Sequence, residues 1–322
     1  MSRRQRKLLR RSGKKHVKEA SEAKEKVEEK KPERKLPFLD IYEKNYKTLL
    51  LIPFLMLVLA ITVIGVSYVS TGEIIPKGVS LKGGITATIV TDADLDIGSI
   101  ESSLRTQFPQ GDVSVRALNK AGRRAGILVD ASDIDQDTLV EALKGLTGGF
   151  DEYSVEEIGS SLGESFFRET ILALLFAFLF MGLVVFFYFR TFVPSTAVIL
   201  AAASDMIVTL AVVILLGVKI STAGIAAFLM LIGYSVDTDI LLSTRVLKRK
   251  EGTVFDRVLG AMATGLTMNL TTLAALTVVL VLTQSDVLKQ IMLILLIGLL
   301  ADIINTWIQN AGILRWYMEG KE

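Results

Sequence analysis

The stretch GYSVDTDILLSTR (residues 233–245) continues an apolar run that begins at Ile220. In a helix that rises about 1.5 Å per residue, about 20 apolar residues cross a hydrocarbon core about 30 Å thick. The run is long enough to do so, and it places two aspartates, Asp237 and Asp239, where lipid penalises charge. This stretch therefore indicates a membrane protein, and the purpose of the two acids becomes the functional question.

The whole chain has the composition of a membrane protein. Of its 322 residues, 51% are hydrophobic, and the mean hydropathy is +0.48. Six apolar runs are each long enough to span a membrane, which predicts an α-helical bundle of six transmembrane helices. The predicted helices are 48–70, 166–189, 194–216, 220–242, 260–282 and 288–314. Small residues such as Ala201 and Gly265 permit these helices to pack closely.

The charged residues predict the orientation of the chain. Residues 1–47 contain 17 Lys and Arg against 8 Asp and Glu, whereas residues 71–165 contain 8 against 16. If six helices alternate, the basic tail, the loop 245–257 and the C-terminal residues 315–322 fall on one side. The positive-inside rule then puts both termini in the cytoplasm of a multi-pass protein of the cytoplasmic membrane. The first run is too long for the core of a signal peptide, so we expect an uncleaved anchor.

The N-terminal tail, residues 1–47, cannot bury a core and is predicted to be disordered or a solvated helix. One interpretation is contact with anionic membrane lipids or with ribosomal RNA, and the other is a tail that sets topology alone. Because no aromatic residue interleaves the basic ones before Phe38, the second is favoured. Nucleic acid is therefore not an expected partner, apart from a ribosome contact of this tail.

The segment between the first two predicted helices, residues 71–165, has the size of one small domain. Strand-like and helix-like patterns alternate in it as βαββαβ, which predicts a ferredoxin-like α+β domain outside the cytoplasm, with both helices on one face of an antiparallel sheet. Asp96 and Asp135 are expected to cap its helices, and Gly145 with Gly148 and Gly149 to end the second. The predicted strands are 85–91, 112–118, 124–131 and 150–158, and the predicted helices are 96–108 and 135–146.

Several classes of function are excluded by what the sequence lacks. Without cysteine there is no thiol nucleophile and no cysteine-based metal site, and no nucleotide-binding glycine loop occurs. GSSLG (residues 159–163) matches a hydrolase nucleophile pattern, but the only histidine, His16, lies in the tail. No catalytic residue, metal or cofactor is therefore predicted, and Gly159 and Gly163 are interpreted as a flexible hinge.

Intramembrane carboxyl groups remain as the unusual feature: Asp205, Asp237, Asp239 and Asp302. An aspartate at a helix centre costs about 2.5–3.5 kcal/mol on insertion scales and usually faces a bundle interior. At about 100° per residue Asp237 and Asp239 point about 200° apart, so both cannot face the same partner. Arg245 is either a cation that snorkels to the interface or a movable counter-ion.

Two interpretations of these aspartates remain open. Burial favours the neutral form of a carboxyl group, which makes a buried aspartate a candidate for proton relay. Alternatively the aspartates hold the bundle together through hydrogen bonds. The expected partners in that case are Ser204, Thr238, Asn269 or Asn305.

Together these stretches resemble the SecF family of protein-export membrane proteins, over nearly the whole chain after the tail. The segment 232–249 is similar to the family's fourth-span signature, with Gly233, Tyr234 and Ser235 at its start. LKGG (residues 81–84), which contains Gly83 and Gly84, resembles the D-x-x-GG-type motif after the first span. Residues 158–163, with Gly159 and Gly163, are similar to the segment that leads into the second span. Residues 298–317 resemble the archaeal branch.

The chain departs from the bacterial pattern at two places. The bacterial fourth span reads G-Y-S-x-N-D-[TS], whereas here Asp237-Thr-Asp239 follows, so the acid stands one residue to either side. The bacterial His-Asp pair of the third span is replaced by Ser204 and Asp205, and Arg245 is retained. The resemblance therefore implies a role for Asp205 and leaves open whether Asp237 or Asp239 joins it.

The resemblance implies an accessory subunit of the Sec translocase, not an enzyme. The family belongs to the RND superfamily, whose members pair two six-helix halves, so the implied partner half is SecD, beside a SecYE-type channel. The pair would promote preprotein export, driven by the proton gradient through the intramembrane carboxyl groups. Two alternatives remain: an RND half-transporter that exports small molecules or lipids, and a structural scaffold of the translocon.

Overall fold

The computed structural model describes residues 37–91, 93, 95–109, 111–120, 123–150, 152–283 and 285–321. Residues 1–36, which include His16 and most of the tail predicted to be disordered, lie outside the described residues. The chain divides into two units, 1–45 and 46–322. In the first, residues 37–44 form helix α2 (Pro37–Lys44). Everything below concerns the second unit.

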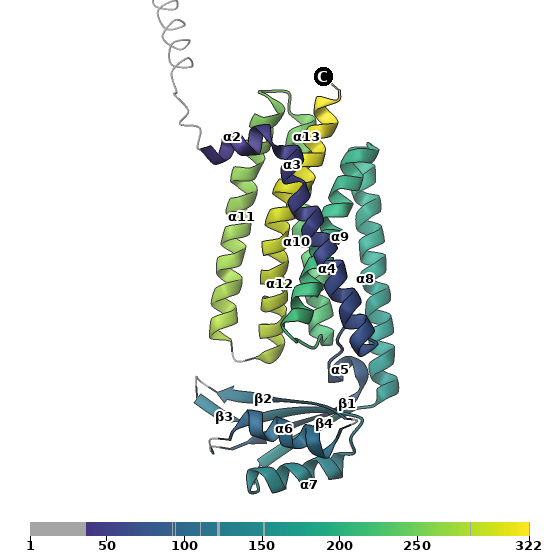
Figure 1. Cartoon of the computed structure of the whole chain (residues 1–322), viewed down its shortest axis with the longest axis vertical. Helices are drawn as coiled ribbons and strands as arrows, with labels where there is room; N and C mark the ends of the chain where they lie inside the picture. Colours follow the sequence, from purple (N-terminus) through teal and green to yellow (C-terminus); the bar gives the residue numbers. More distant parts are fainter. Residues whose placement is uncertain are drawn as a thin grey trace, which may run out of the picture. The chain divides into compact units, whose positions relative to one another are not determined.

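Six helices in the described residues are long and apolar enough to cross a membrane (Figure 1). The second, fourth, fifth and sixth extend well beyond the predicted runs at one end, since polar residues at a helix end lower the apolar signal without breaking the helix. The spans are α3 with α4 (Tyr46–Leu49 and Leu51–Thr71), α8 (Ser160–Phe189), α9 (Phe192–Leu215), α10 (Thr222–Lys248), α11 (Val254–Leu282), and α12 (Asp286–Ile304) continued by the π-helix η1 (Asn305–Asn310) and α13 (Ala311–Glu319).

Helices α9 and α10 form the centre of the bundle. About half of the membrane-spanning window of each is buried (50% and 56%), against 6% for α8 and 11% for the first span. Small residues make this possible, because Ala197, Ala201 and Ala202 of α9 are almost fully buried. Polar groups on the inner faces of these two helices are therefore shielded from lipid.

The α+β domain, residues 84–158, contains four strands and two helices in the predicted order. The sheet order is β2-β3-β1-β4 with every neighbouring pair antiparallel. Alternate strand residues and the apolar faces of both helices share one core, so both helices cover the same face of the sheet (Figure 1). The elements are β1 (Gly84–Val90), α6 (Ile97–Gln107), β2 (Asp112–Lys120), β3 (Arg123–Ser132), α7 (Gln136–Thr147) and β4 (Glu152–Ile158).

The predicted helix caps of this domain are confirmed. Asp96 accepts a hydrogen bond from the N–H of Gly98 at 3.1 Å, and Asp135 accepts one from the N–H of Asp137 at 3.2 Å. Gly148 ends α7 in the left-handed conformation, at φ 75°. These local signals are strong because each satisfies backbone groups that the helix itself leaves unpaired.

The glycines at the start of α8 are not a flexible hinge. Gly163 lies inside the first turns of α8, and a Cβ there would lie 3.0 Å from the carbonyl carbon of Lys82 and closer still to the N atom of Gly83. Gly83 itself has φ 86°, a conformation that favours glycine. Backbone therefore packs directly on backbone here, which fastens the α+β domain to the second span.

Gly163→Val is expected to destabilise the protein by about 2 kcal/mol, because overpacking against a backbone cannot be relieved by a side-chain rotation. The measurement is thermal unfolding of the purified protein in detergent. Gly65→Val is the matched control, since Gly65 lies in a spanning helix with nothing within 4 Å of its added Cβ. Equal melting temperatures for the two variants would contradict the close packing at Gly163.

Candidate functional site

Three of the four intramembrane aspartates lie buried together in the bundle. Asp205 of α9 accepts hydrogen bonds on both oxygens, from the hydroxyl of Ser235 at 2.5 Å and from the side-chain amide of Asn305 at 2.7 Å. Its side chain is fully buried. Asp205 thus joins α9 to α10 and to η1.

Asp239 of α10 is fully buried and faces the same π-helix. Its Oδ1 atom accepts a hydrogen bond from the side-chain amide of Asn310 at 2.7 Å and lies 3.0 Å from the hydroxyl of Thr306. Its Oδ2 atom is buried without a hydrogen-bond partner. The carboxyl group is therefore only half satisfied by the protein.

Asp302 of α12 completes the group. Its Oδ2 accepts a hydrogen bond from the side-chain amide of Asn269 at 2.9 Å, and its Oδ1 lies 2.9 Å from the hydroxyl of Thr306. That hydroxyl also contacts Asp239, yet it carries a single hydrogen and can donate fully to only one acceptor. A proton on one of the two carboxyl groups would satisfy the second contact, so the geometry accommodates a proton between Asp302 and Asp239.

The π-helix η1 supplies most of the partners. A π-turn inserts an extra residue into the helix, and such turns occur frequently at functional sites. Here residues 305, 306, 309 and 310 are all buried, and each makes a side-chain hydrogen bond toward α9, α10 or α12. We use the name carboxyl cluster for Asp205, Asp239 and Asp302 with their partners Ser235, Asn269, Asn305, Thr306 and Asn310.

No cation neutralises the carboxyl cluster in the part of the chain that the structure describes. None of Asp205, Asp239 and Asp302 forms an ion pair there. A buried carboxylate without a cationic partner is costly, and three in one site repel one another. If all three carboxyl groups were ionised, the described side chains would therefore leave their charge uncompensated.

Asp237 lies on the opposite side of α10, as the predicted angle between the two acids requires. It is exposed, and within the described ranges it has no hydrogen bond and no ion pair. With Met230, Gly233 and Tyr234 it forms an exposed stripe at helical spacing, which we call the open stripe of α10. Asp239, not Asp237, shares the carboxyl cluster with Asp205.

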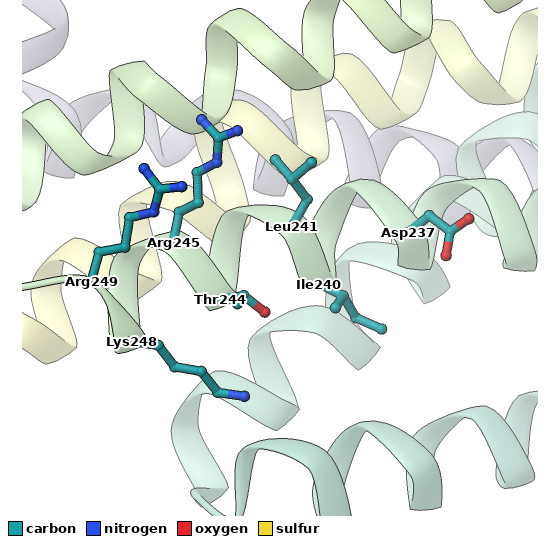
Figure 2. Close-up of a pocket in the computed structure, with 7 residues that line it drawn as sticks. All are labelled: Asp237, Ile240, Leu241, Thr244, Arg245, Lys248 and Arg249. Carbon is teal, nitrogen blue, oxygen red and sulfur yellow. The ribbon is translucent and has the colours of Figure 1, made fainter.

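In this structure Arg245 pairs with neither Asp237 nor Asp239. Its guanidinium donates to the carbonyl of Gly260 and, at 2.9 Å, to the hydroxyl of Thr264, both on α11. Figure 2 shows the side chain of Arg245 pointing away from Asp237. Both residues line a pocket of about 400 Å³ beside the C-terminal half of α10. The pocket is lined by Asp237, Ile240, Leu241, Thr244, Arg245, Lys248 and Arg249.

The expected hydrogen-bond partners of the aspartates are found in part. Asn269 and Asn305 do bind Asp302 and Asp205, whereas Thr238 lies 3.2 Å from the carbonyl of Tyr234 in its own helix. Ser204 donates instead to the carbonyl of Leu200 and accepts from Gln309. Sequence reasoning missed Thr306, Gln309 and Asn310. The positions of Thr306 and Asn310, four and eight residues after Asp302, were the signal that could have shown them.

A second feature connects α10 to the α+β domain. The N–H of Ile220 donates to the carbonyl of Pro76 at 2.7 Å, and the N–H of Gly78 donates to the carbonyl of Ile220 at 2.9 Å. We call this pairing of residues 76–80 with residues 219–222 the joint. Lys219 also forms an ion pair with Asp112 at the start of β2. Because α10 begins directly after the joint, displacement of α10 would reach the α+β domain through it.

The joint is also held by the bundle. Gln290 of α12 donates to the carbonyl of Lys219 at 2.6 Å and accepts from the hydroxyl of Ser221, the N-cap of α10. Leu81, in the short helix α5 (Val79–Lys82) that the sequence analysis did not predict, is buried in the same apolar cluster as Ile220. The joint is therefore a packed contact rather than a loose linker.

Residues 138–320 match the family model described as protein export membrane protein SecD/SecF, C-terminal. A protein named protein-export membrane protein SecF from Methanothermobacter thermautotrophicus is 42% identical over 286 residues, which cover 87% of this chain and 96% of that protein. This chain belongs to the SecF family of protein-export membrane proteins. A SecF-family relative from Methanocaldococcus jannaschii is 41% identical, over 85% of this chain and 96% of that protein.

Solved structures of SecDF share the fold. The crystal structure of SecDF, described as a translocon-associated membrane protein, from Thermus thermophilus matches with a TM-score of 0.68 at 19% identity. The match covers 88% of this chain, and the chain spans 39% of that SecDF chain. A second SecDF structure, in a super-membrane-facing form, matches with a TM-score of 0.57 at 21% identity over 84% of this chain and 38% of that one.

Proposed function

We propose that this SecF-family chain pairs with SecD as an accessory subunit of the Sec translocase and promotes preprotein export, driven by protons that enter and leave the carboxyl cluster. The observation that carries the proposal is the position of Asp239. It lies in a buried cluster that pairs with no cation among the described residues, and on the same helix that begins at the joint with the α+β domain. A change in the charge of Asp239 that displaces α10 would thus be transmitted through the joint to the α+β domain.

The arrangement in the membrane follows from this proposal. The tail 1–47 and the end 315–322 are cytoplasmic, 48–70 and 166–314 hold the spans, and 71–165 lies outside. The α+β domain is of the ferredoxin-like type, which its βαββαβ order and its sheet order β2-β3-β1-β4 support. Emerging preprotein is its substrate. A SecYE-type channel and membrane lipids are the neighbours that the location implies.

The mechanism is a shift between two hydrogen-bond arrangements. When the carboxyl group of Asp239 or Asp302 takes up a proton, the hydroxyl of Thr306 is freed to donate to the other, and the mutual repulsion of the acids falls. The membrane potential contributes about 2.3 kcal/mol per charge per 100 mV. That is enough to bias a two-state packing of η1 against α10 by more than tenfold, at about 1.4 kcal/mol for each factor of ten.

The partner half is expected on the open stripe of α10. An exposed aspartate within a span is costly against lipid, and a neighbouring protein that donates a hydrogen bond to Asp237 removes that cost. In this chain, which has no cysteine, we expect Tyr234→Cys to form crosslinks to cysteines introduced along the spans of SecD. Leu270→Cys, on the exposed side of α11, is the matched control. Crosslinks from position 270 but not 234 would place the partner elsewhere.

The scaffold interpretation is the second candidate, and a specific observation favours it: both oxygens of Asp205 and of Asp302 are hydrogen-bonded. Such bonds hold α9, α10, α11 and α12 together whether or not protons move. Export by cells or vesicles that carry Asp205→Asn separates the two functions, because asparagine keeps hydrogen bonds but cannot titrate. The relatives are named protein-export membrane proteins, which counts against a half-transporter for small molecules or lipids.

A further inference from the structure

Within the described residues, four oxygen atoms around the buried aspartates have no hydrogen-bond partner. They are Asp239 Oδ2, Asn305 Oδ1, Gln309 Oε1 and Asn310 Oδ1. A buried polar atom without a hydrogen-bond partner is costly, so four in one bundle are a large penalty unless something binds them.

The hydrogen-bond network fixes what that occupant must be. Asn305 and Asn310 direct their amide hydrogens at Asp205 and Asp239, so their oxygens are left over. Gln309 must donate to Ser204, since the hydroxyl hydrogen of Ser204 is already given to the carbonyl of Leu200. All four unpaired atoms are therefore acceptors, and the missing groups are hydrogen-bond donors or a cation.

Water fits this set better than a metal ion does. A hard cation collects about six oxygens, with carboxylates among them. Of the six carboxylate oxygens of Asp205, Asp239 and Asp302, five already accept or contact a hydrogen-bond donor, and only Asp239 Oδ2 is unoccupied. A water molecule, which donates two hydrogens, satisfies two such acceptors without requiring further charge.

Ser243 extends the same pattern along α10. It stands one turn after Asp239 on the same buried face, on the side of Arg245, and its hydroxyl has no partner. Serines and threonines in a helix usually donate to the carbonyl four residues earlier, as Thr209 does to Asp205 at 2.6 Å. Ser243 does not do so, although its side chain is fully buried. An unpaired hydroxyl in this place is free to bind an occupant outside its own helix.

We propose that internal water fills the carboxyl cluster and that Ser243 passes protons between Asp239 and the cytoplasmic end of the bundle. The hydroxyl accepts a proton from the water at Asp239 Oδ2 as it releases its own to a water on its cytoplasmic side. Its O–H bond is thus broken and remade, and it ends unchanged. This route rests on the proposed function and adds its ligand, water, and one proton-relay residue, Ser243.

The test compares variants in proteoliposomes that hold the full chain with SecD, with a pH-sensitive dye in the lumen and an imposed potential. Ser243→Ala is expected to slow proton uptake about tenfold, and Ser243→Thr to restore it, at unchanged melting temperature. Ser195→Ala is the matched control, because Ser195 is also buried but donates to the carbonyl of Thr191 at 2.8 Å. A purely structural serine would change the melting temperature and leave uptake unaltered, which overturns the proposal.

Two further measurements keep the outcomes distinct. If Asp239→Asn abolishes uptake while Ser243→Ala matches the unmodified protein, the route is wrong and the proposed function stands. If neither variant alters uptake, the proposed function fails as well. In the chain without other cysteines, Ser243→Cys should react with a small hydrophilic thiol reagent, whereas Leu242→Cys, buried beside it, should not. Uptake that requires sodium ions would overturn the assignment of water.

Discussion

Asp239→Asn is expected to abolish the stimulation of export by a proton gradient, a loss of about tenfold or more, while the bundle stays folded and paired with SecD. Asparagine has the shape of aspartate, and its side-chain oxygen can still accept from Asn310. Asparagine cannot take up and release a proton, as the carboxyl group of Asp239 would. The measurement is preprotein export into vesicles with and without an imposed gradient, alongside the melting temperature of the purified variant.

Asp237→Asn is the sharpest comparison for this result, because it removes the same charge two residues away on the opposite side of α10. The response to the gradient should survive in Asp237→Asn once the complex is assembled, since Asp237 is exposed and forms no hydrogen bond or ion pair with the carboxyl cluster among the described residues. Loss of the response in Asp237→Asn with retention in Asp239→Asn would reverse the assignment of the two acids. Normal export in both would favour the scaffold.

The spans and the α+β domain were predictable because their signals are local. An apolar run of about 20 residues identifies a span wherever it occurs. The helix caps at Asp96 and Asp135 can be predicted from the residue type and the helical pattern that follows it directly. The end of a span was less predictable. Polar residues around Ser160 and Glu319 continue helices past the apolar runs, and hydropathy does not register them.

The carboxyl cluster could be predicted only in part. Helical geometry showed that Asp237 and Asp239 point apart, but which of them faces inward depends on how α9 and α12 pack, which no local pattern encodes. The π-helix was not predicted, since its extra residue shifts the helical period at Asn305 and brings Asn310 onto Asp239. Gly163 was misinterpreted for a related reason: its role comes from Gly83, a residue distant in sequence.

Gly78→Pro is expected to uncouple proton uptake from export. The backbone of Gly78 has φ −80°, which proline can adopt, but proline lacks the N–H that binds the carbonyl of Ile220, and its ring would occupy the place of that hydrogen. The substitution breaks one of the two backbone hydrogen bonds of the joint and pushes its two segments apart there, while the carboxyl cluster is not altered. We expect export stimulated by the gradient to fall about tenfold or more and proton uptake in proteoliposomes to persist.

Gly78→Ala is the matched control for the joint, because alanine keeps the N–H and its Cβ would lie 3.4 Å from the carbonyl oxygen of Ile220, an ordinary contact. A disulfide bond that holds the joint closed gives the opposite perturbation. The Cβ of a residue at position 78 lies 3.9 Å from that of Lys219, within the range for a disulfide, so Gly78→Cys with Lys219→Cys should crosslink on oxidation. If the joint transmits motion as a fixed contact, the locked protein exports normally. Loss of export on oxidation and its return on reduction would instead mean that the two segments separate in every cycle, and coupling would then have to pass through the contact between Gly83 and Gly163.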